Sequence, residues 1–73
     1  MTERILVDAR GLSCPQPVLE TKRASEAHPG NSLEVLVSTV TSRENVSRFA
    51  RGQGFRVSSE ATPEGDFRVL LDR

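Results

Sequence analysis

The chain alternates between short apolar runs and longer stretches in which polar and apolar residues mix at helical spacing. Runs of a few β-branched or aliphatic residues, bounded by turn-forming residues, are typical of strands. The second run is apolar at three alternate positions and also at Leu36, which predicts a central strand covered in part on both faces. The pattern predicts four strands, at Ile5–Val7, Leu33–Val37, Phe55–Ser58 and Phe67–Leu71.

Two segments have the composition of helices. The first is predicted to run from Pro15 to about His28 and to stop at Pro29, because the residue before a proline avoids the α conformation. The second is predicted to begin at Thr41 as N-cap, with Glu44 three residues later completing a capping box. Helical spacing predicts that its core-facing stripe comprises Val46, Phe49 and Ala50.

The order of the predicted elements is β-α-β-α-β-β. Turn-forming residues occupy Thr62–Asp66, so the last two strands are expected to pair as a hairpin. Two helices on one face of a four-stranded mixed sheet would bury both helical stripes, which predicts an α/β (α+β) two-layer sandwich. A chain of 73 residues is expected to form one domain, over residues 1–73. Core positions are predicted for the three aromatic residues, Phe49, Phe55 and Phe67.

Charge and composition exclude several classes of protein. Ten basic and ten acidic residues leave no net charge, which argues against direct nucleic-acid binding. One cysteine excludes an internal disulfide, a dithiol couple and a cysteine zinc cluster, so neither a metal nor another cofactor is expected. The apolar run Ile5–Val7 is too short for a signal peptide or a membrane span. We therefore expect a cytoplasmic protein with a reduced thiol and no membrane contact.

Candidate chemistry concentrates between the first strand and the first helix. Proline is common at the first position of a helix, so Pro15 is expected to place Cys14 at or beside the N-cap. Free N–H groups and the positive helix end there favour a thiolate, and Arg10 is a candidate for additional positive charge. The alternative is a buried packing cysteine, since free cysteine is often buried. The approach through Gly11 and the proline-rich helix start favour a reactive residue.

A single thiolate limits the chemistry available. Disulfide exchange needs a second cysteine, and acyl transfer needs a base. The one histidine, His28, lies about 14 residues along the same helix, roughly 21 Å away, and is given no catalytic role. Carriage of a group remains, and a persulfide on Cys14 fits because thiolate attack at sulfur both forms and breaks it. Two alternatives stay open, a non-catalytic regulatory or RNA- or protein-binding module and a thiol redox sensor.

The same segment carries a family resemblance, in the run Asp8-Ala9-Arg10-Gly11-Leu12-x-Cys14-Pro15-x-Pro17. It resembles the signature of the TusA/SirA-like sulfur-carrier family, whose CPxP motif opens the first helix. The resemblance extends over essentially the whole chain and implies a fold like the C-terminal domain of initiation factor three. It implies that Cys14 carries sulfur as a persulfide. The matching residues expected to shape or support the loop are Asp8, Arg10, Gly11, Leu12, Pro15 and Pro17.

The family resemblance also implies protein partners. A cysteine desulfurase or another sulfurtransferase would be the sulfur donor. An acceptor enzyme in tRNA thiolation, molybdenum-cofactor synthesis or sulfur oxidation would receive the sulfur.

The second half of the chain is similar to the selenium-metabolism (YedF-like) branch, in the runs Glu44-Asn45-Val46-x-Arg48-Phe49-Ala50 and Gly54-Phe55-x-Val57. That branch often carries a second, DsrE-like domain, so a DsrE-like protein is a further candidate partner. A stand-alone protein and an isolated N-terminal domain both fit.

Two positions depart from the family pattern. Ser38–Thr39 stands where relatives often place acidic or amide residues, and is expected to alter partner contacts. Ser25 stands in place of a large aliphatic residue, which predicts a slightly under-filled interface beneath the first helix.

Overall fold

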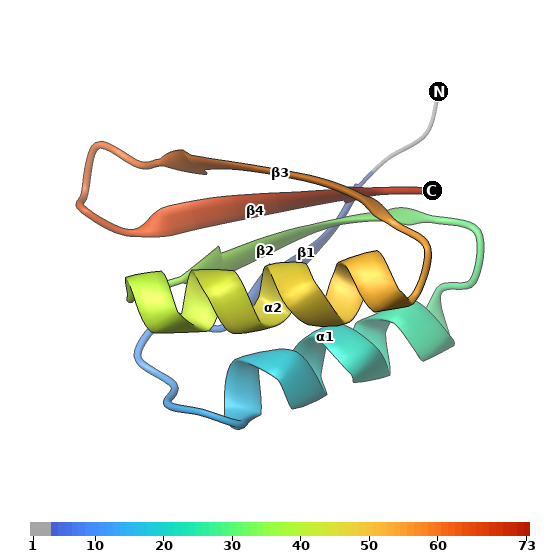
Figure 1. Ribbon diagram of the computed structural model, residues 1–73. Coiled ribbons are helices and arrows are strands. Elements are labelled where there is room, and N and C mark those ends of the chain that lie inside the picture. Colours follow the sequence, from blue (N-terminus) through green and yellow to red (C-terminus); the bar gives the residue numbers. More distant parts are fainter. Residues whose placement is uncertain (1–3) are drawn as a thin grey trace.

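The structure, a computed structural model, describes residues 4–73. The order of its elements is the predicted one, with two helices and four strands (Figure 1). The first helix starts one residue later than expected, and the third strand extends to Ala61 instead of Ser58. The bounds of the elements are β1 Arg4–Asp8, α1 Gln16–Ala27, β2 Ser32–Val37, α2 Val40–Gly52, β3 Arg56–Ala61 and β4 Phe67–Asp72.

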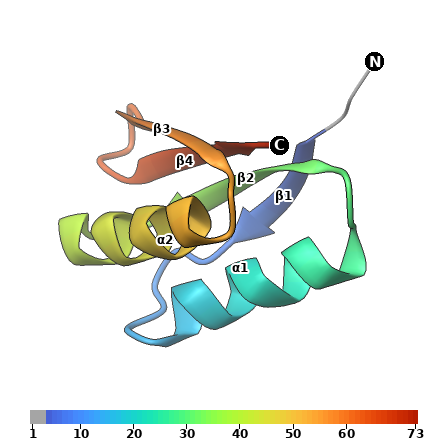
Figure 2. The same ribbon diagram turned by 45° about the vertical axis from the view of Figure 1, so that its right-hand side comes forward.

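The four strands form one mixed sheet in the order β1-β2-β4-β3. β1 and β2 are parallel, whereas β4 lies antiparallel between β2 and β3. Both helices cover the same face of this sheet (Figures 1 and 2), which confirms the two-layer sandwich. Because β1 and β2 are parallel, both strands end at the same end of the sheet. The two helices therefore begin at the same end of the molecule (Figure 1).

The core lies between the sheet and the two helices. β2 and β4 pair with their apolar residues in phase, so that Leu33 faces Leu71 and Val35 faces Val69 across the ladder. All four side chains are fully buried, as is Val37 at the end of β2. β2 is central, as predicted, but the helices cover only one of its faces. On the open face Leu36 is half-buried and lies opposite Arg68.

The predicted N-cap of the second helix is wrong by two residues. The cap is Thr39, whose Oγ1 accepts the backbone N–H of Ser42 at 3.0 Å. Thr39 has extended backbone angles that suit an N-cap, whereas Thr41 already lies within the helix. Glu44 forms an ion pair with Arg43 at 2.8 Å and does not complete a capping box. The helix starts early because only Ser38 and Thr39 separate it from β2.

The predicted core stripe of α2 is correct at Val46 and Ala50 and wrong at Phe49. Val46 and Ala50 are fully buried, but Phe49 is only half-buried and lies outside the core cluster. Ser42 and Ser47 are buried instead, and their small side chains allow the helix to approach the sheet closely. Of the other two aromatic residues, Phe55 is buried in the core cluster, and Phe67 is partly buried and packs against that cluster.

Ser25 is half-buried on α1, and its hydroxyl donates to the backbone carbonyl of Lys22 at 2.8 Å. Its own carbonyl accepts a hydrogen bond from the guanidinium of Arg73 at 3.0 Å. The same guanidinium donates to the carbonyl of Asn31 and lies 4.5 Å from the centre of the Phe55 ring. The C-terminal residue thus joins the end of the first helix to the core.

Candidate functional site

The loop between β1 and α1 begins as a continuation of the sheet. Ala9 is fully buried, and its N–H donates to the carbonyl of Leu36 at 2.8 Å, as another rung of the β1–β2 ladder. The chain then turns away, and the N–H of Leu12 donates to the carbonyl of Ala9 at 3.3 Å. Gly11 takes φ +79° within this turn, a conformation that glycine adopts without steric strain. The motif glycine therefore makes the turn toward α1.

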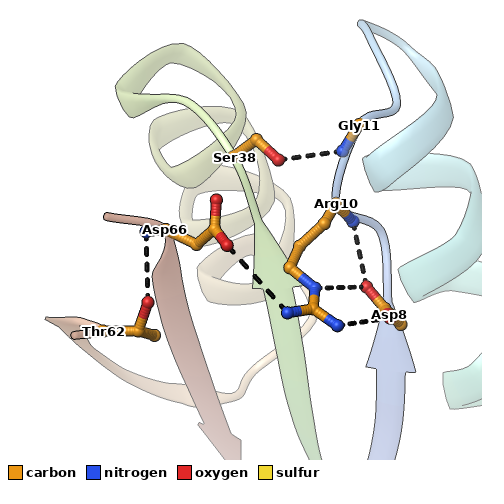
Figure 3. A network of polar contacts seen from close by, with 6 residues as sticks. All are labelled: Asp8, Arg10, Gly11, Ser38, Thr62 and Asp66. Carbon is orange, nitrogen blue, oxygen red and sulfur yellow. Dashed lines mark hydrogen bonds and ion pairs between the residues drawn. The ribbon is translucent and has the colours of Figure 1, made fainter. Parts of the chain in front are cut away.

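Arg10 forms a bidentate ion pair with Asp8 at the start of the loop (Figure 3). Its Nε and Nη2 lie 2.9 Å from Asp8 Oδ1 and Oδ2, and its backbone N–H also donates to Oδ1 at 3.2 Å. These bonds favour the carboxylate, and they lower the pKa of Asp8 from its ordinary value of 3.8 to about 2. The hydrogen-bonded carboxylate in turn raises the pKa of Arg10. The ion pair therefore joins the last residue of β1 to the second residue of the loop, just before Gly11.

Arg10 also faces Asp66 in the turn between β3 and β4, with 4.0 Å between Nη1 and Oδ2 (Figure 3). Thr62 shapes that turn, because its buried Oγ1 accepts the backbone N–H of Asp66 at 3.1 Å. From the sequence, Arg10 is a candidate source of positive charge for Cys14. The structure assigns that charge instead to the carboxylates of Asp8 and Asp66.

A second hydrogen bond joins the loop to the start of the other helix. The N–H of Gly11 donates to Ser38 Oγ at 2.8 Å (Figure 3). Ser38 follows β2 directly and precedes Thr39, the N-cap of α2. Ser38 and Thr39, which were expected to alter partner contacts, therefore have internal contacts: Ser38 to the cysteine loop and Thr39 to the start of α2.

Cys14 is exposed, which rules out the buried packing cysteine. It lies beside the N-cap as predicted, but Pro15 is the cap itself and Gln16 the first helical residue. Pro17, the second helical residue, is fully buried and anchors the helix start, and its carbonyl accepts the hydroxyl of Thr21 at 2.8 Å. The motif thus combines the exposed sulfur of Cys14 with a buried proline, Pro17, three residues later.

The start of α1 offers the sulfur fewer free backbone N–H donors than a helix N-terminus without prolines would. Pro15 and Pro17 have no N–H group, and the N–H of Gln16 donates to the carbonyl of Ser13 at 2.9 Å. The first helical turn is therefore poor in free N–H groups. A charge on the sulfur must be stabilised mainly by other groups.

Sequence reasoning missed one residue of the site. Asn45, on α2, directs its side-chain Nδ2 toward Cys14 Sγ at 3.8 Å. Its position was noted only within a run shared with a family branch. Asn45 comes one helical turn after buried Ser42 and directly before buried Val46, so its place on the helix flank follows helical spacing. Only the packing of α1 against α2 brings it to the cysteine.

A surface depression of about 420 Å³ opens beside the sulfur. None of its lining residues carries a charged side chain, and several carry hydroxyl groups. Two exposed apolar side chains, Leu12 and Val40, lie in the two segments that border it. The lining consists of Gly11, Leu12, Ser13, Cys14, Ser38, Thr39, Thr41 and Ser42.

The structure brings the predicted site residues together in one loop. Gly11, Leu12 and Cys14 line the depression. Asp8 and Arg10 form the ion pair at the start of the loop, and Pro15 and Pro17 lie at the start of α1. Within residues 4–73, no group of three or more histidine, cysteine or acidic side chains is placed to hold a metal ion. No helix in the same part of the chain combines the length and apolar character needed to cross a membrane.

Comparisons with known proteins identify relatives of this chain. The family model described as sulfurtransferase TusA matches residues 5–73. A Methanocaldococcus jannaschii protein named as a candidate sulfur carrier is 37% identical over 68 residues, covering 92% of this chain and 91% of its own. The Bacillus subtilis protein YrkI, also named as a candidate sulfur carrier, is 34% identical over 62 residues, covering 84% and 81% of the two chains.

A solved structure gives the same result for the fold. The crystal structure of a SirA-like protein from Desulfitobacterium hafniense superimposes with a TM-score of 0.84 and 32% identity, covering 92% of this chain and 93% of that one. The match of the family model over nearly the whole sequence, together with these relatives, establishes the family. The chain belongs to the TusA sulfurtransferase family, and its CPxP motif is the segment that positions Cys14.

Proposed function

We propose that this protein is a sulfur carrier that holds sulfane sulfur as a persulfide on Cys14 and passes it to an acceptor enzyme. The observation that carries the proposal is the exposed sulfur of Cys14 beside an open, uncharged depression. Membership of the TusA family and the names of the relatives support the same role.

The proposed chemistry consists of two exchanges at sulfur. In loading, the Cys14 thiolate attacks the outer sulfur of a donor persulfide; a new S–S bond forms, the donor S–S bond breaks, and the donor leaves as a thiolate. In delivery, an acceptor thiolate attacks the outer sulfur of the Cys14 persulfide, and Cys14 leaves as a thiolate. Neither step needs an external oxidant or reductant. Because the chain has no second cysteine, no internal thiol can discharge the persulfide as a disulfide.

The partners proposed for these steps are proteins. A cysteine desulfurase or another sulfurtransferase is the donor class, and an enzyme of tRNA thiolation or of selenium metabolism is a candidate acceptor, with a DsrE-like protein as a further partner. Exposed Leu12 and Val40 beside the depression supply apolar surface for such contacts. A cytoplasmic location belongs to the same proposal, since the persulfide requires a reduced thiol.

The test is the mass of the intact protein after incubation with a cysteine desulfurase and cysteine. The wild-type chain should gain about 32 Da, one sulfur atom, and Cys14→Ser should gain nothing. No gain on the wild type, under conditions that load a known carrier, would overturn the proposal. A gain of oxygen under peroxide without any sulfur loading would favour the redox-sensor alternative.

A further inference from the structure

The residues that line the depression beside the Cys14 sulfur carry no positive charge. Arg10, the nearest cation in the motif, is bound to Asp8 and faces Asp66. None of the residues that line the depression is charged, and the two prolines remove N–H donors from the start of α1. The residues that line the depression can therefore stabilise a Cys14 thiolate only through neutral dipoles.

Asn45 supplies such a dipole directly. Its amide Nδ2 lies 3.8 Å from Cys14 Sγ, within hydrogen-bond reach of a sulfur acceptor. Within residues 4–73, this is the one hydrogen bond that the Asn45 side chain makes. An amide group donates without carrying charge, so it can stabilise a thiolate and still tolerate an anionic persulfide in the same place.

The position of Asn45 is well defined by its neighbours. Ser42, three positions before Asn45, and Val46, directly after it, are both buried. Thr39 caps the helix six residues before Asn45, and the hydroxyl of Ser38 accepts a hydrogen bond from Gly11 of the cysteine loop. The Cys14 loop and the helix that carries Asn45 are therefore linked by hydrogen bonds at Ser38 and Thr39.

We infer that Asn45 is a functional residue of this carrier, whose side-chain N–H stabilises the Cys14 thiolate during sulfur transfer. The inference rests on the proposed function. A donor at Sγ stabilises the thiolate that attacks the donor persulfide, which favours loading. It also makes Cys14 a better leaving group, because a more stable thiolate departs faster when an acceptor attacks the outer sulfur.

The first experiment needs no sulfur. Alkylation of Cys14 by iodoacetamide is measured from about pH 7 to about pH 10 for the wild type, Asn45→Leu and Asn45→Asp. The ratio of the rate near pH 7 to the rate near pH 10 should fall about two- to fivefold in Asn45→Leu, which removes one hydrogen bond. It should fall further in Asn45→Asp, which places a carboxylate beside the sulfur.

The chain offers a matched control in its other asparagine, Asn31. Asn31→Asp makes the same change in charge beyond the far end of α1, a helix of 12 residues that is about 18 Å long. Its alkylation profile should match that of the wild type. Thermal unfolding of all variants separates a change at the sulfur from a loss of folding, and Asn45→Ser serves if Asn45→Asp does not fold.

The second experiment follows the delivery step. Each variant is loaded with inorganic polysulfide: the Cys14 thiolate attacks a terminal sulfur, one S–S bond of the polysulfide breaks, and the shortened polysulfide leaves. Unreacted polysulfide is removed, and loading is confirmed by intact mass. Cyanide is then added at about pH 7; it takes the outer sulfur as thiocyanate and releases the Cys14 thiolate. Thiocyanate should form severalfold more slowly with Asn45→Leu and Asn45→Asp than with Asn31→Asp.

The outcomes separate the two proposals. Equal alkylation profiles for Asn45→Asp and Asn31→Asp in folded protein would overturn the role of Asn45, even if both variants carry sulfur. A wild-type chain that never gains sulfur would overturn the carrier function, whereas the alkylation profiles would still decide whether Asn45 acts on the thiolate.

Discussion

The guanidinium of Arg10 and the carboxylate of Asp8 form a bidentate ion pair with both contacts at 2.9 Å, although the two residues lie only two positions apart in the chain. The pair spans the point where β1 ends and the cysteine loop begins. It links the last residue of β1 to the loop before Gly11, and it engages the one cation of the motif. Arg10 in this protein is therefore a brace for the loop that carries Cys14.

This brace should be sensitive to acid. The Arg10 hydrogen bonds lower the pKa of Asp8 from 3.8 to about 2, so the folded protein holds that proton less tightly than the unfolded chain. The contribution of the pair to stability is therefore complete above about pH 4 and lost as the pH falls toward 2. Urea unfolding of the wild type and Asp8→Asn should give midpoints that differ at neutral pH and converge near pH 2. A constant difference across this range would contradict the assignment.

Ser38 should be needed to hold the cysteine loop against the start of α2. Ser38→Ala leaves the N–H of Gly11 without its 2.8 Å partner, and should lower the free energy of unfolding by about 0.5–1.5 kcal/mol. The measurement is urea unfolding, and Ser59→Ala on the exposed edge strand β3 is the matched control. Equal effects of the two substitutions would show that the Gly11–Ser38 bond contributes nothing.

The stability lost on substituting Gly11 should depend only on how readily the new residue adopts the backbone conformation of Gly11. A Cβ added at this position meets no atom within 4 Å, so the cost arises only from the positive φ of 79°. Gly11→Ala should destabilise the fold by about 1–2 kcal/mol, and Gly11→Asn by less, since asparagine adopts this region more readily. Thermal unfolding of both variants tests the order. A larger loss with asparagine would indicate a steric cause.

The second helix provides a direct comparison between the predicted and the observed cap. Thr39→Ala removes the side-chain acceptor for the Ser42 N–H and should lower stability by about 1 kcal/mol. Thr41→Ala changes an exposed residue inside the helix and should be nearly neutral, because alanine is the better helix former. Chemical denaturation of both variants is the test. The reverse order would favour Thr41 as the cap.

The periodicity of the chain was sufficient for the architecture. Alternating apolar positions in β2 and β4 pair in phase across the ladder, and turn residues between β3 and β4 form the expected hairpin. The two wrong predictions, the N-cap of α2 and the burial of Phe49, both depend on how α2 is placed on the sheet. Thr39 and Thr41 are both acceptable caps locally, and the short connection after β2 decides between them. Phe49 has the right spacing for a core residue, but the sheet selects a face of α2 that contains Ser42 and Ser47.

For the candidate site, the sequence by itself was sufficient to single out Cys14 and its loop as the place where chemistry is expected. A lone cysteine before a proline-rich helix start, preceded by Asp8, Arg10 and Gly11, is a local pattern, and local patterns can be recognised along the chain. Tertiary structure alone decided what surrounds the sulfur. Arg10 turns to Asp8 and Asp66, and Asn45 reaches Cys14 from 31 positions away. Spacing in sequence carries no information about contacts between elements, because these depend on how α1 and α2 pack on a shared sheet.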